Sequence, residues 1–110
     1  MPTYINKLKT NPNYRNVLTP EPPATFTVGT SSQLAVPANT DRVGLILVNL
    51  SPSVNVYLGL GHPAELNSGV TLLPFIAWRL DDFTFFVDDV YAISDQDGIN
   101  ISIQEFSQNY

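Results

Sequence analysis

The chain has 110 residues, enough for one domain, and carries a net charge of −5 with only 14% charged residues. It contains no cysteine, which excludes a disulfide-stapled fold and a thiolate metal site and fits folding in a reducing cytoplasm. We expect no nucleic-acid partner, because phosphate contacts need clustered Lys and Arg, and no membrane partner, because no apolar run reaches the length of a spanning helix.

Residues 1–24 are predicted to form an extended arm that precedes a compact body. Five of the nine prolines lie here, and proline fixes φ and donates no backbone hydrogen bond. The segment has a net charge of +2, whereas the remainder has −7. A frayed terminus with incidental apolar residues is the alternative. The expected anchors of the arm are Tyr4, Ile5, Lys7, Leu8, Lys9, Tyr14, Arg15, Val17 and Leu18.

The longest apolar run, residues 42–50, is predicted to be the central strand of the body. Side chains alternate between two faces of a strand, and here both faces are mostly apolar. Because a small antiparallel sheet usually leaves one face in water, the second face needs a cover, from the arm or from another copy. The candidate residues for such a contact between copies are Val43, Leu45, Leu47, Ile46 and Val48.

The rest of the body alternates short strand-like segments with turn residues. Before the central run these segments are 25–28 and 33–36, and after it they are 54–60, 70–73, 75–80, 83–87, 90–93 and 99–104. Strands at this spacing without a convincing helix predict an all-β fold. We expect residues 25–110 to form an antiparallel β-sandwich of about eight short strands, jelly-roll-like or Ig-like in its connections.

Residues able to support catalysis or metal binding are few. His62 is the only histidine, and no Gly-x-Ser-x-Gly context accompanies it, so we expect an exposed loop histidine and no enzyme activity. Acidic residues gather in 81–97 and end in Asp97-Gly98, a pair typical of hairpin turns. Calcium binding is the alternative for this segment, but the closing Glu of a calcium loop is missing. We predict no metal site and no cofactor.

Aromatic residues in the second half could form a platform for a ligand such as a sugar. Tyr57 and Trp78 are the candidates to face a ligand, and Phe86 is the aromatic residue most expected to be exposed. The alternative, which we favour, is that the aromatic residues of this half belong to the core of the sandwich, since each ring buries a large area. These residues are Phe75, Trp78, Phe83, Phe85, Phe86 and Tyr91.

Several short motifs between about residues 29 and 106 follow one another in a fixed order. They are Gly29-Thr30-Ser31-Ser32-Gln33-Leu34, Asn39-Thr40-Asp41-Arg42, Leu45-Ile46-Leu47-Val48-Asn49-Leu50-Ser51, Val56-Tyr57-Leu58-Gly59, Gly69-Val70-Thr71-Leu72, Val90-Tyr91-Ala92-Ile93-Ser94 and Gln104-Glu105-Phe106. Together they resemble a small β-sandwich module of tailed-bacteriophage virion structural proteins, among them head decoration (cement) and head-fibre proteins. The chain departs from that module at Leu73-Pro74-Phe75, where such modules more often turn through a glycine, and in its longer acidic segment 81–89.

The resemblance implies a structural virion protein, made in the host cytoplasm and located on the capsid surface. It implies assembly of the module into homotrimers or similar assemblies. The arm lies outside the resemblance, and we expect it to bind the major capsid protein. Two alternatives stay open: a virion-surface module that binds host glycans or a receptor, and a tail or baseplate component with the same module.

Overall fold

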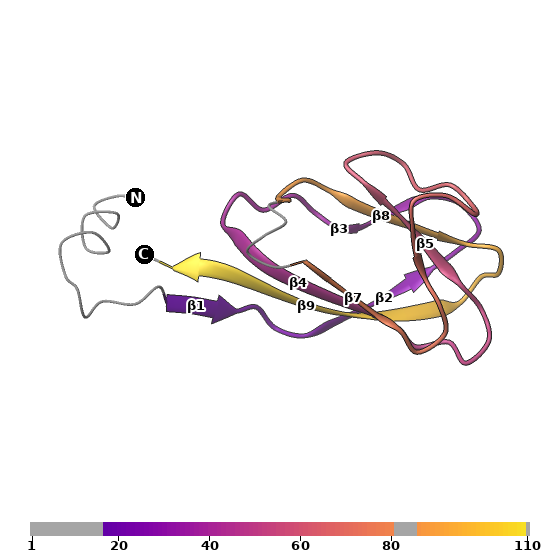
Figure 1. The fold of residues 1–110 in the computed structure, drawn as a ribbon, viewed down its shortest axis with the longest axis horizontal. Helices are drawn as coiled ribbons and strands as arrows, with labels where there is room; N and C mark the ends of the chain where they lie inside the picture. The colour runs from indigo at the N-terminus through magenta and orange to yellow at the C-terminus, as the bar shows by residue number, and fades with distance from the viewer. Residues whose placement is uncertain (1–16, 81–85, 110) are drawn as a thin grey trace.

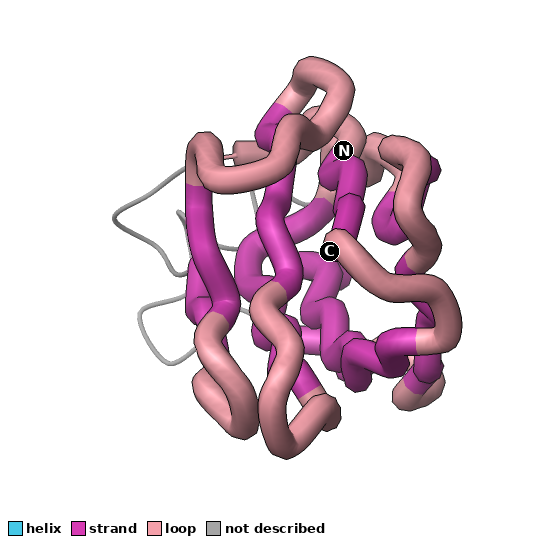
Figure 2. Tube along the Cα trace, turned by 90° about the vertical axis from the view of Figure 1, so that its right-hand side faces the viewer, coloured by secondary structure: helices cyan, strands magenta, loops and turns pink. Residues whose placement is uncertain are grey.

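The computed structural model describes residues 17–80 and 86–109, which form nine strands joined by loops and contain no helix (Figures 1 and 2). This confirms the predicted all-β antiparallel fold. The strands are β1 (Val17–Pro20), β2 (Ala24–Val28), β3 (Gln33–Val36), β4 (Arg42–Asn49), β5 (Val56–Leu60), β6 (Val70–Leu72), β7 (Ala77–Leu80), β8 (Val90–Ser94) and β9 (Ile99–Asn109).

Two sheets pack face to face with the core between them. One sheet has the order β1-β9-β4-β7, with β2 also paired to β9, and the other has the order β3-β8-β5-β6. Every pairing in both sheets is antiparallel. Among the described strands, β5 and β6 are the only consecutive ones that pair, so most loops carry the chain from one sheet to the other.

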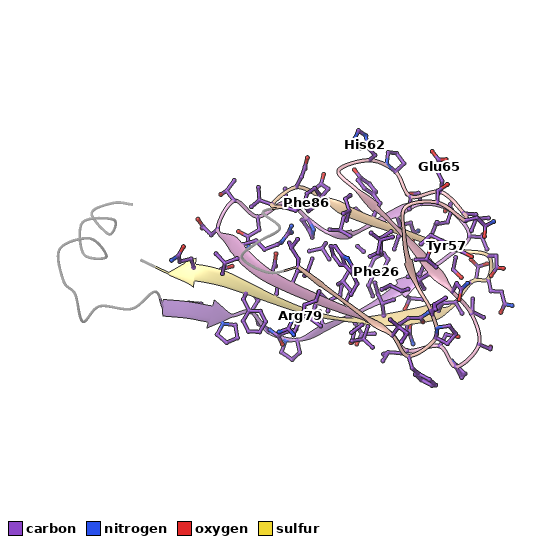
Figure 3. All side chains as sticks on the ribbon, viewed as in Figure 1. Phe26, Tyr57, His62, Glu65, Arg79 and Phe86 are labelled. Carbon is purple, nitrogen blue, oxygen red and sulfur yellow. The ribbon has the colours of Figure 1, made fainter. Side chains whose placement is uncertain are left out.

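The central run is the strand β4, which lies between β9 and β7. Its alternation places Leu45 and Leu47 in the core, both fully buried. They meet residues of the opposite sheet such as Val56, and Phe26 of β2 lies in the same layer between the sheets (Figure 3). The apolar area that these side chains bury stabilises the sandwich by roughly 1.5–3 kcal/mol for each large residue.

The strands β1 and β2 both follow one edge of β9. Residue Val17 pairs with Asn109, and Val28 pairs with Ile99, so residues 17–28 run along the whole of β9. The two strands are separate because residues 21–23 include two prolines, which cannot donate ladder hydrogen bonds. Residues 17–24, expected at the end of the arm, therefore lie against the sheet as an edge of the sandwich.

The two ends of β4 each carry one buried polar side chain. Arg42, at the first end, is 1% exposed. Its Nε donates to Glu105 Oε2 at 2.6 Å, and its guanidinium also donates to the carbonyl oxygens of Pro37, Phe86 and Asp88. The side chain thus joins β9 to the loops before β4 and before β8, and its donors meet oxygen atoms instead of apolar core.

Asn49, at the other end of β4, is also fully buried. Its Nδ2 donates to the carbonyl oxygens of Val54 and Leu72 at 2.7 and 2.9 Å, and its Oδ1 accepts from Ser51 N. This one amide therefore ties the end of β4 to the loop before β5 and to the end of β6. Such a bonded side chain fits in a core, whereas an unpaired amide would be costly there.

Two local expectations differ from the structure. The Asp97-Gly98 pair does form a turn, with Gly98 at φ +78°, but the turn connects β8 to β9 in the other sheet and so closes no hairpin. Of the strand expected at 83–87, residues 83–85 lie outside the described residues, and Phe86 and Val87 are in no strand.

Candidate interaction surfaces

The arm anchors divide between two parts of the chain. Seven of them lie outside the described residues: Tyr4, Ile5, Lys7, Leu8, Lys9, Tyr14 and Arg15. The other two, Val17 and Leu18, belong to β1, whose backbone pairs with the last residues of β9. Figure 1 shows β1 and the end of β9 as a ribbon that projects beyond the two-layered part of the sandwich. Residues 1–16 therefore join the body at this end, which we call the ribbon end.

The candidate interface residues on β4 lie on two different faces of the strand, and one of these faces is buried in the core. Leu45 and Leu47 are core residues and are unavailable to a second copy, which corrects their place among the candidates. Val43 lies at a bulge between Arg42 and Gly44 in the pairing with β9. Ile46 and Val48 alternate with the buried leucines and face outward, where each is half-buried.

The outward face of this sheet is of mixed polarity. A groove of about 540 Å³ lies over it, lined by Ile46 and Val48 together with residues of β2 and β9 such as Ser102 and Gln104. Arg79 of β7 pairs with Ile46. Because polar side chains stand beside each apolar one, this face has the composition of a sheet surface in contact with water.

Tyr57 is buried on the outer side of the sheet that contains β5. The ring is 7% exposed and packs with Ala64 and Ile93 in a second apolar cluster on the outer side of its sheet. Its hydroxyl donates to Asn67 Oδ1 at 3.0 Å. The loop after β5 covers this cluster and is held by a hydrogen bond from Ala64 N to Ser32 Oγ. Tyr57 is therefore buried beneath this loop, and its ligand-facing role stays a prediction.

Trp78 and Phe86 also belong to the core. Trp78 pairs with the buried Leu47 across β7 and β4, so the two residues share the inner face of the sheet. Both Trp78 and Phe86 are half-buried and pack against the main core cluster. The structure supports the core interpretation for Trp78 and Phe86, so Phe86 is not the exposed aromatic residue that the sequence suggested. The core interpretation is wrong for Phe75, which is 64% exposed.

Titratable side chains among residues 17–80 and 86–109 form no group that could hold a metal ion. No set of three His, Asp or Glu side chains there is placed to hold a metal ion. His62 is exposed, as expected, and its position near Glu65 can be followed in Figure 3. Both residues line a groove of about 380 Å³ together with Leu58 and Val70. Asp97 accepts a hydrogen bond from Thr30 N at 3.0 Å and so links the turn between β8 and β9 to the loop between β2 and β3.

One surface that the sequence analysis missed is an apolar cluster at the end of β4 opposite the ribbon end. Six large apolar residues are exposed in the described chain, and four of them lie here: Leu50, Leu73, Phe75 and Ile76. Backbone hydrogen bonds from Phe75 N to Asn49 O and from Asn49 N to Ile76 O hold the two parts of the cluster together. We call these four residues the apolar turn.

The backbone of the apolar turn is strained at Phe75. Ile76 N donates to Leu73 O at 3.0 Å, Pro74 occupies the second position, and Phe75 occupies the third with φ +60°. These features define a type II turn, whose third position favours glycine or asparagine. A left-handed conformation costs a residue with a side chain about 1–2 kcal/mol. The ring gains little burial in return, because Phe75 is 64% exposed.

The signal for this turn was present in the sequence as the missing glycine after Pro74. A proline followed by two large apolar residues, in a stretch without charge, is unusual for a surface turn.

Comparison with protein-family models, with curated proteins and with solved structures finds no match to the chain. Within the described residues, no helix is long and apolar enough to cross a bilayer.

Proposed function

We propose that this chain is a structural virion protein of a tailed bacteriophage, a decoration or cement protein that binds the outer surface of the capsid through its N-terminal segment. The support from the sequence is the ordered set of motifs that resembles such modules. The protein acts by binding, and neither a cofactor nor a catalytic group takes part. Copies of the body associate on the shell, as the trimers of similar modules do.

The observation that carries the proposal is the attachment of β1 to β9. Backbone pairing from Val17 to Pro20 holds the start of the body against the end of β9, and Glu21 N donates to Glu105 O. Residues 1–16 are thus joined to a fixed point at one end of a rigid sandwich. A binding segment tethered in this way can follow a large partner surface while the body stands clear of it.

The composition of residues 1–16 suits a protein surface as partner. Apolar residues such as Ile5 and Leu8 supply area to bury. Lys7, Lys9 and Arg15 give the segment a net positive charge, whereas the body has a net negative charge. Weak contacts of this kind give strong overall binding on a capsid, because identical subunits repeat across its surface and several linked contacts can form at once.

The test uses the full chain and empty shells assembled from the major capsid protein of the same phage. We expect the double variant Ile5→Asp, Leu8→Asp to lose co-sedimentation with the shells, because two carboxylates replace two apolar anchors. The matched control Asn6→Asp, Thr10→Asp adds the same charge at polar positions and keeps most of the binding. Equal binding by both double variants, or no binding by the unmodified chain, would overturn the proposal.

A further inference from the structure

We propose that copies of this chain associate by exchanging β1, so that β1 of one copy pairs with the end of β9 of a second copy. The inference rests on the association of copies within the proposed function and names the segment that carries it. The partner strand is present in the structure, because β1 pairs with β9 of its own chain in the register Val17↔Asn109 to Pro20↔Phe106. Exchange keeps this register and these backbone contacts and changes only the copy that supplies β1.

The part of β9 that pairs with β1 lies beyond the core. In the described chain, the residues of β9 that belong to the main core cluster or pack against it are Ile99, Ile101 and Ile103, and all three stand opposite β2. β1 stands opposite residues 106–109, in the ribbon that projects beyond the two-layered part of the sandwich (Figure 1). Release of β1 therefore leaves the core closed, and a short pairing outside the core opens more readily than the core strands do.

A break in the ladder separates β1 from β2. Three residues, 21–23, stand opposite only two residues of β9, 104–105, so the chain carries a bulge at this point. Two of the three are prolines, which have no N–H to donate to the ladder. Glu21 stays attached to β9, since its N donates to Glu105 O and its carbonyl oxygen accepts from Gln104 Nε2. β1 can therefore leave β9 at a defined pivot just before Glu21, while β2 keeps its place.

The observed pairing identifies the occupant of the opened edge. Release of β1 leaves backbone N–H and C=O groups of residues 106–109 unpaired, and an unpaired edge is a template for another strand. A second copy supplies the same four residues whose pairing with this edge is observed, and it receives the same four in return. The contact is therefore reciprocal, as a closed assembly of identical copies requires.

Exchange requires no large new surface. Each copy loses the contacts of its own β1 and gains the same contacts from its partner, so the balance is set by the freedom lost when two molecules combine. The association is therefore weak between free molecules and increases with concentration. On a capsid, the proposed attachment of residues 1–16 holds copies close together, and each binding segment stays joined to a pairing of β1 with β9 in either arrangement.

Two double-cysteine variants of the full chain test the exchange, and the chain contains no cysteine of its own. The ribbon variant is Thr19→Cys, Ser107→Cys, at a pair that joins β1 to β9. The matched control is Thr25→Cys, Ser102→Cys, at a pair that joins β2 to β9. Opposite residues of an antiparallel pair have Cα atoms about 4.5–5.5 Å apart, which a disulfide can span. Urea unfolding of the reduced variants confirms that both stay folded.

Each variant is refolded from urea under reducing conditions, without capsids, at concentrations from about 10 µM to about 1 mM, and is then oxidised. Denaturing electrophoresis without reductant separates disulfides within one chain from disulfides between chains. For the ribbon variant we expect species above the 12.1 kDa of one copy, with a fraction that rises about tenfold or more over this range by mass action. The control stays at the mass of one copy, because β2 covers the core and does not exchange.

Three results would overturn the inference. One is a ribbon variant that oxidises within single chains at every concentration, which would show that β1 stays with its own β9. Another is equal formation of linked chains by both variants, which would report collisions between thiols. The last is a ribbon variant whose thiols stay free, since pairing of β1 with either copy of β9 brings them together. None of these results depends on capsid binding, so the failure of this inference and that of the proposed function remain distinguishable.

Discussion

The two ends of β4 use different means to hold the molecule together, and they present different surfaces. At the ribbon end, Arg42 uses charge-assisted hydrogen bonds, and the neighbouring strands β1 and β9 carry the chain outward through backbone pairing. At the other end, the neutral amide of Asn49 closes the structure, and the adjoining turn exposes apolar side chains without charge. The first end therefore rests on charged and backbone contacts, and the second leaves Leu50, Leu73, Phe75 and Ile76 exposed.

The largest expected effect on stability is at the ribbon end. Arg42→Ala leaves Glu105 and three carbonyl oxygens without their donor, so we expect the free energy of unfolding to fall by about 3–5 kcal/mol. Urea unfolding followed by tryptophan fluorescence measures the change. The exposed Arg79 provides the control, because Arg79→Ala removes the same charge at the surface and should alter stability by less than about 0.5 kcal/mol. A loss below about 1 kcal/mol for Arg42→Ala would show that the network is dispensable.

A smaller loss is expected at the other end. Asn49→Ala leaves the carbonyls of Val54 and Leu72 without a donor, and we expect a destabilisation of about 2–3 kcal/mol in the same unfolding experiment. Asn100, an exposed residue of β9, gives the matched control, with a change of about 1 kcal/mol or less for Asn100→Ala. If the two alanine variants were equally stable, the amide of Asn49 could not be what closes this end.

The smallest expected change in stability is at Phe75, and there we expect a gain in stability instead of a loss. We expect Phe75→Gly to raise the free energy of unfolding by about 0.5–1 kcal/mol, because relief of the left-handed strain exceeds the added flexibility of glycine. Phe75→Ala is the matched control, since it removes the ring but keeps the strain, and it should not stabilise the protein. A destabilised glycine variant would mean that the ring stabilises the single copy.

Much of the fold could be predicted from the sequence because the strands alternate regularly. Alternation along residues 54–60 places Val56 and Leu58 on one face, and both are buried in the structure. The central position expected for residues 42–50 is also correct. Which face of β4 points inward could not be predicted, because Leu45 and Leu47 are as apolar as Ile46 and Val48. The buried face even carries Arg42 and Asn49, residues that a hydrophobic pattern would place in water.

The surfaces were harder to predict than the fold. Tyr57 is buried by a loop without regular periodicity, so no pattern in the sequence could indicate that Ala64 covers its side of the sheet. Phe75 adopts a left-handed backbone conformation, which sequence rules for turns expect of glycine or asparagine. The pairing of β1 with β9 joins residues about 90 positions apart, and the prolines of 20–23 concealed the strand from a local analysis.

The measurement that tests the account most directly is the binding of a chain beginning at Val17 to empty shells of the major capsid protein. Because the pairing of β1 with β9 is retained, we expect the free energy of unfolding of this chain to lie within about 0.5 kcal/mol of that of the full chain. If residues 1–16 hold the capsid-binding site, the full chain co-sediments with the shells to saturation and the chain from Val17 stays in the supernatant. Saturable binding by the folded chain from Val17 would contradict it, since attachment would then lie on the body.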